Sequence, residues 1–148
     1  MQINWKERLL NWKTKFGCTV APPVKEELLR KAFEKLGTFP RELIELFHYC
    51  NGIELNWFKI FPIENKYNIK DTWDGILRAN NRETTRLLNR DEGLLSQFLI
   101  FAILDGGRCA VIKNSDNSIW YEENNELHET DLNLPDFIET CLRESKEL

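Results

Sequence analysis

The most constraining feature of the sequence is a short apolar helix pattern with a defined start and stop, between Gly37 and Leu55. Pro40 suits the first turn of a helix, where its missing N–H has no intrahelical partner anyway. Apolar residues then recur at helical spacing, and Asn51-Gly52 ends the pattern because glycine adopts the left-handed conformation at a helix C-terminus without steric cost. An apolar strand follows over 57–63. The pattern therefore predicts a helix over about 40–51 that packs centrally against a sheet.

The rest of the chain predicts a single α+β domain over residues 1–148, with a mostly antiparallel sheet flanked by helices. Helical apolar spacing favours helices over about 3–16 and 24–36, and Asp131 or Asn133 can cap a last helix. Short apolar runs between Gly, Asn and Asp turns predict a meander of antiparallel strands. These strands are expected at 98–104, 109–113, 119–121 and 127–130.

Residues 64–93 have the least regular pattern. Apolar residues such as Ile69 and Ile76 share a helical face, and Asn80-Asn81 interrupts it. Arginines recur here at every fourth position, which suits either a solvated helix face or a grip on phosphate or an acidic partner. We expect the exposed helix face for this row, which comprises Arg78, Arg82, Arg86 and Arg90.

Charge argues against nucleic acid as a direct ligand. The formal net charge is −4 and the sequence pI is about 5.3, whereas phosphate-backbone binding needs clustered Lys and Arg. The charge is also uneven, because residues 1–35 carry eight basic and four acidic side chains, and residues 122–147 carry nine acidic and two basic. An acidic protein of this kind suits a basic protein partner.

Neither a signal peptide nor a membrane span is expected. Charged residues interrupt the N-terminal segment, and the longest apolar run, 98–104, is too short to cross a bilayer. The cysteines show no C-x-x-C pairing, and we expect them to be buried free thiols in the reducing cytoplasm. They are Cys18, Cys50, Cys109 and Cys141.

The sequence offers little that could perform catalysis or hold a cofactor. His48 and Cys50 are two residues apart, so on a helix they point in different directions and form no nucleophile–base pair. His128 has no metal-ligand spacing around it, and Gly106-Gly107 lacks the following helix of a phosphate loop. Asp71 and Asp74 do not make an oxygen-rich cation loop. We therefore expect a non-catalytic chain without metal or cofactor.

An acidic, aromatic stretch near the C-terminus is the candidate binding surface. Its charge has two interpretations, a solubilising surface or a docking patch that accelerates encounter with a basic partner. Glu129 and Asp131 are expected on one face of a strand. The proposed contact residues are Glu122, Glu123, Glu126, Glu129, Asp131, Trp120 and Tyr121, with Trp73 of the 64–93 segment as a further candidate.

Three stretches of the sequence resemble the SMI1/KNR4 family, also called the SUKH superfamily. The first is the 37–55 pattern, with its Phe39-Pro40 pair and Asn51-Gly52. The second comprises Phe98–Ala102, Asp105–Gly107 and Cys109–Ile112, and the third is Leu134–Ile138. Together they extend over about 20–145.

This resemblance implies an α+β fold and a role in binding proteins. Many bacterial members are immunity proteins that neutralise toxin domains, often nucleases, and fungal members act as regulatory interaction scaffolds. The family has no characteristic catalytic residues. The resemblance thus implies a cognate toxin domain as partner, with an intracellular scaffold or ligand-binding module as the alternative. The acidic charge of the chain adds the expectation that this toxin domain is basic, and a hydrolase is kept as a weak third alternative.

Overall fold

An antiparallel meander forms the sheet of this protein. The computed structural model describes residues 3–38, 40–72, 74–83, 85 and 87–147, and within them seven strands pair in chain order. The predicted α+β class, with helices beside a mostly antiparallel sheet, is confirmed. The strands are β1 (Thr19–Val20), β2 (Ile53–Leu55), β3 (Phe58–Ile60), β4 (Phe98–Ile103), β5 (Cys109–Lys113), β6 (Ile119–Glu123) and β7 (Glu126–Glu129).

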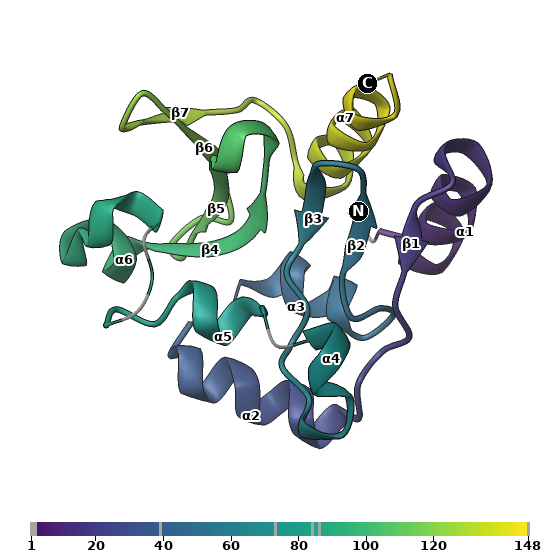
Figure 1. Ribbon diagram of the computed structural model, residues 1–148, viewed down its shortest axis with the longest axis horizontal. Helices are drawn as coiled ribbons and strands as arrows, with labels where there is room; N and C mark the ends of the chain where they lie inside the picture. Colours follow the sequence, from purple (N-terminus) through teal and green to yellow (C-terminus); the bar gives the residue numbers. More distant parts are fainter. Residues whose placement is uncertain (1–2, 39, 73, 84, 86, 148) are drawn as a thin grey trace.

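Helices pack around the β1–β5 part of this sheet (Figure 1). α1 and α7 lie together beside β1–β3, whereas α2, α4 and α5 gather on another side, and the β6–β7 hairpin projects far from α1. The helices are α1 (Trp5–Phe16), α2 (Glu26–Leu36), α3 (Arg41–Phe47), α4 (Ile69–Thr72), α5 (Ile76–Ala79), α6 (Glu92–Gln97) and α7 (Leu134–Lys146), with 3₁₀ turns η1 (Lys66–Asn68), η2 (Leu87–Arg90) and η3 (Asp105–Gly107).

The central helix predicted from the sequence is α3, although it is shorter than expected. It begins after Pro40 and ends at Phe47, and a turn connects it to Asn51. Phe47 is 1% exposed, and its ring lies 5.9 Å from that of Phe33 on α2. The apolar spacing therefore identified a helix in the core, whereas the Asn51-Gly52 stop lies one turn beyond its end.

The first two strands of the sheet were not predicted. Ile53–Leu55 forms β2, which turns through Asn56 (φ 51°) and Trp57 into β3. Gly52 enters β2 with φ 102°, and a side chain here would bring its Cβ within 2.8 Å of the Ile60 carbonyl oxygen. Both the backbone conformation and the close approach require glycine. Gly52 therefore permits the close approach within the β2–β3 hairpin, in addition to ending the segment that follows α3.

The prediction of one exposed helix face carrying the arginine row is wrong. α5 ends at Ala79, so Arg78 lies on the helix and Arg82 lies beyond it. Arg86 lies outside the described residues, as does the side chain of Arg90. The helix begins only at Ile76, because the backbone of Gly75 before it is extended (φ −110°, ψ −172°) and the Ile76 N–H donates to the Pro62 carbonyl at 2.8 Å. A further short helix, α6, was also missed; Asp91 caps it by accepting a hydrogen bond from the Leu94 N–H at 3.1 Å.

Two asparagine side chains tie the chain to neighbouring backbone. Asn51 accepts a hydrogen bond from the Ile63 N–H at 2.7 Å and donates one to the Ile63 carbonyl at 3.1 Å. Asn80 bonds the N–H and the carbonyl of Ile100, both at 2.8 Å, where the β4–β5 register shifts. The Asn51 and Asn80 side-chain amides thus take the place of a neighbouring strand at Ile63 and Ile100, because an amide offers the same donor and acceptor as a peptide group.

Candidate functional site

The acidic stretch folds into a β-hairpin at the edge of the sheet. Asn124 and Asn125 form its two-residue turn with φ of 53° and 64°, the positive values that a type I′ turn requires and that asparagine tolerates. Register pairs Glu123 with Glu126 and Tyr121 with His128. β7 pairs with β6 on one side and is the last strand of the sheet. We call residues 119–129 the acidic hairpin.

Strand register divides the acidic side chains between the two faces of this hairpin. Alternate residues of a strand point to opposite faces, and residues directly opposite each other share one. One face therefore carries Trp120 and Glu122 with their partners Glu129 and Leu127, and the other carries Tyr121 and Glu123 with their partners His128 and Glu126.

Asp131 does not belong to this arrangement. The prediction that Glu129 and Asp131 share a strand face is wrong, because β7 ends at Glu129 and Asp131 lies in the bend that leads to α7. The chain leaves the sheet there because Thr130 makes the last pairing, through its N–H to the Ile119 carbonyl at 2.9 Å. Asn133, one of the two predicted caps, then caps α7 by accepting the Asp136 N–H at 2.9 Å.

Both aromatic residues of the hairpin are half-buried and held by neighbours. The Trp120 ring lies 5.6 Å from Phe98 in an edge-on contact, and its Nε1–H donates to the Ser118 hydroxyl at 2.7 Å. Tyr121 stacks on His128 at 5.3 Å with planes 24° apart. Such fixed rings lose little conformational freedom when they bind a partner, which favours their use at an interface.

Two cations, Arg108 immediately before β5 and Lys113 at the end of β5, lie against residues of β6. The Arg108 guanidinium is 6.0 Å from the Tyr121 ring and 3.9 Å from the Glu123 carboxylate, and the Lys113 ammonium is 5.9 Å from the Trp120 ring. Glu126 and Glu129 are exposed beyond them. Four glutamates against these two cations leave the hairpin negative.

Glu122 is partly buried, and it is close enough to Cys109 at the start of β5 for its charge to act on that thiol. Desolvation, followed by the negative charge of Glu122, raises the pKa of the Cys109 thiol to about 12. The structure therefore brings four of the predicted acidic residues and both aromatic residues into one hairpin. Trp73, the remaining candidate, lies outside the described residues.

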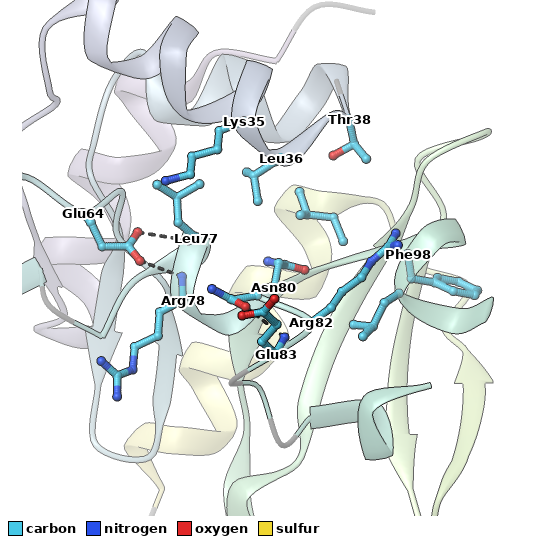
Figure 2. A pocket seen from close by; sticks show the side chains of 13 residues that line it. Lys35, Leu36, Thr38, Glu64, Leu77, Arg78, Asn80, Arg82, Glu83 and Phe98 are labelled. Atoms are coloured by element: carbon cyan, nitrogen blue, oxygen red, sulfur yellow. Dashed lines mark hydrogen bonds between the residues drawn. The ribbon is translucent and has the colours of Figure 1, made fainter. Parts of the chain in front are cut away.

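A groove of about 950 Å³ between α2, α5, α6 and β4 was not predicted from the sequence (Figure 2). Lys35, Leu36 and Thr38 line it from the α2 side, with Arg82 and Phe98 across from them. Its other lining residues are Glu64, Leu77, Arg78, Asn80, Asn81, Glu83, Leu95 and Leu99. The irregular 64–93 segment forms much of this wall, and irregular backbone beside rigid elements is a common place for binding residues.

Glu64 has a structural role at this groove. Its carboxylate accepts hydrogen bonds from the Leu77 N–H at 3.0 Å and the Arg78 N–H at 2.7 Å, both at the start of α5. These N–H groups have no intrahelical acceptor, so a carboxylate there caps the helix and meets the positive end of its dipole. The Glu64 carboxylate is thus held in place by the backbone at the start of α5.

No catalytic arrangement emerges among the residues that the structure describes. Cys50 is fully buried, and burial raises the pKa of its thiol to about 12, which suppresses the nucleophilic thiolate. His48, by contrast, is exposed at the end of α3. Among the described side chains, no group of three or more His, Cys, Asp or Glu is placed to hold a metal ion. No helix within the described ranges has the length and apolarity needed to cross a membrane.

Comparison with known proteins places this geometry in a family context. The model of the SMI1/KNR4 family (SUKH-1) matches residues 23–140, which confirms the resemblance noted in the sequence. The matched range begins after α1 and β1, ends within α7, and includes both the acidic hairpin and the groove. No curated protein matches the chain.

Proposed function

The chain belongs to the SMI1/KNR4 family (SUKH-1), and from this premise we propose that it is an immunity protein that binds and neutralises a cognate toxin domain. The family is known for immunity-type domains that are typically non-catalytic. We further propose that the partner is a basic domain such as a nuclease, and that the protein acts in the reducing cytoplasm. Four buried free thiols support that compartment.

The family match carries this proposal, and the acidic hairpin is the surface that we assign to the partner. It combines exposed carboxylates with two half-buried aromatic rings and stands away from the helices (Figure 1). Aromatic anchors within a charged rim are common in protein interfaces. A nuclease groove is positively charged because it holds a phosphate backbone. Carboxylates that occupy such a groove would exclude the nucleic acid.

The division of charge between two faces suggests how the hairpin would bind. Glu122 and Glu129 lie on one face, and Glu123 and Glu126 on the other. A flat partner surface can contact one of these pairs, whereas a groove that encloses the hairpin contacts both. We propose the enclosed mode, since the projecting type I′ turn leaves both faces accessible at its tip.

The experiment begins with the toxin, sought in the gene adjoining that of this protein or by pull-down and mass spectrometry from the native cell. The protein should protect cells that express this toxin and should inhibit it in vitro. Replacing Glu122, Glu123 and Glu126 by Lys should slow association by about tenfold or more, and added salt should slow the wild-type rate, because exposed charges are screened beyond about 8 Å at physiological ionic strength. A matched triple reversal of Glu26 on α2, Glu144 on α7 and Glu147 just after α7, all of them exposed, should leave binding nearly unchanged.

Two paired variants then test the mode of binding. Reversing Glu122 with Glu129 alters one face, and reversing Glu123 with Glu126 alters the other. Both should weaken binding if the hairpin is enclosed, and one alone should do so if it lies flat. A toxin that binds all these variants as well as wild type would move the interface away from the hairpin. A pull-down that returns regulatory proteins and no toxin would favour the alternative role as a scaffold or ligand-binding module.

A further inference from the structure

The groove between α2 and α5 carries an excess of positive charge in an otherwise acidic protein. We call the groove of Figure 2 the α2–α5 groove. Lys35, Arg78 and Arg82 line it together with Glu64 and Glu83, and the Glu64 carboxylate accepts hydrogen bonds from the two N–H groups at the start of α5. Among the described residues, no carboxylate forms an ion pair with Lys35 or Arg82. An anionic group that entered the groove would meet both cations.

The floor of the groove is apolar and its wall contains one unsatisfied hydroxyl. Leu36, Leu77 and Phe98 contribute the apolar surface. The Thr38 hydroxyl oxygen is buried and has no hydrogen-bond partner among the described residues. A volume of about 950 Å³ is at the upper end for pockets that enclose a small molecule. The groove is therefore suited to a short polypeptide segment that combines acidic and apolar side chains.

The chain itself supplies a segment of this composition. The acidic hairpin presents Glu123 and Glu126 at its tip beside Leu127, so two exposed carboxylates match the two cations Lys35 and Arg82. In Figure 1, α6 lies between the β6–β7 hairpin and the helices α5 and α2, and residues of α2, α5 and α6 line the groove. Phe98, at one end of the groove, contacts Trp120 of β6 at 5.6 Å. The hairpin therefore rises next to its own groove and projects away from it.

We propose that the α2–α5 groove binds the acidic hairpin of a second copy of this chain. A two-fold axis near α6 would bring each hairpin to the groove of the other copy, so the same contact is made twice and the assembly closes as a dimer. The contact is weak and salt-dependent, because its charges are exposed at a rim. This self-association does not rest on the proposed function.

Charge exchange tests this dimer directly. Sedimentation velocity of wild type, from a few to several hundred micromolar at about 50 mM salt, should show a monomer–dimer equilibrium that about 500 mM salt shifts to monomer. The groove variant Lys35→Glu/Arg82→Glu and the hairpin variant Glu123→Lys/Glu126→Lys should each dissociate about tenfold more readily. Mixing the two should restore the dimer, since the native hairpin of one meets the native groove of the other and the two reversed surfaces also attract.

Matched controls change the same charge elsewhere. Two control variants, Lys6→Glu/Lys70→Glu and Glu144→Lys/Glu147→Lys, alter exposed residues on α1 and α4 and at the C-terminal end of α7, outside both surfaces. Both should dimerise like wild type. Restored association of the mixed variants also shows that both remain folded, and circular dichroism of each variant alone provides a second check. A wild type that stays monomeric at low salt overturns the proposal. The proposal is also overturned if neither charge reversal weakens the dimer, or if mixing the two variants does not restore it. A monomer whose groove binds a different acidic protein overturns it as well.

Discussion

Asn51→Ala should be among the most destabilising substitutions of a polar residue in this protein. The Asn51 residue is 5% exposed, and its amide satisfies both backbone groups of Ile63, a residue with no exposed surface. Alanine leaves that N–H and that carbonyl buried without partners. Each unsatisfied buried group costs about 1–3 kcal/mol, so the free energy of unfolding should fall by about 2–6 kcal/mol. A loss of that size is a large part of the 5–15 kcal/mol typical of a domain.

Urea denaturation followed by tryptophan fluorescence measures this loss as a lower midpoint at constant m-value. Asn11→Ala is the matched control, because Asn11 is exposed on α1 and its replacement should change stability by about 0.5 kcal/mol or less. Wild-type-like stability of Asn51→Ala, within about 1 kcal/mol, would mean that water or a relaxed backbone satisfies Ile63 and that the amide does not hold this segment.

Two further predictions concern the core and the thiols. Phe47→Ala should reduce the free energy of unfolding by about 3–5 kcal/mol in the same assay, because the ring is fully buried and packs on Phe33 of α2. A loss well below 1 kcal/mol would contradict the central position of α3. A thiol reagent should react slowly with the native protein and should count four groups after unfolding, because burial raises the pKa of Cys50, Cys109 and Cys141 to about 12. These thiols stay protonated in the folded state and ionise in the unfolded state above about pH 9, so the free energy of unfolding should fall as pH rises beyond that value. A disulfide, zinc released on unfolding or fast labelling of the native protein would refute the assignment of four buried free thiols.

The sequence predicted elements whose signals are local. Apolar spacing located α1, α2 and α3, and the strands from β4 onward were found because turn residues separate short apolar runs. The last helix was anticipated from possible caps, of which Asn133 proved correct. In each case the residues that determine the element lie within it or next to it.

The missed features depend on residues distant in the chain. Asn51 was interpreted as a helix stop, although its amide bonds Ile63 twelve residues later, and Asn80 was interpreted as a break, although it bonds Ile100. β1 and β2 are too short to show an alternating pattern, and they become strands by pairing with each other and with β3. The groove likewise joins α2 to β4 across about sixty residues. The division of charge in the hairpin, by contrast, follows from strand period once the Asn124-Asn125 turn sets the register.

The residues that identify the family and those assigned to the partner form separate sets in this fold. Asn51, Gly52 and the 98–102 run are buried, and they fix the β2–β3 hairpin and the centre of the sheet. The acidic hairpin pairs with β5 at one edge, and its outer strand supports no further strand. Substitutions at its exposed positions should therefore cost the fold little, about 0.5 kcal/mol or less each, whereas they change the charge that a partner meets. Under the proposed function, such a scaffold would allow the charge of the binding surface to change while the same core is retained.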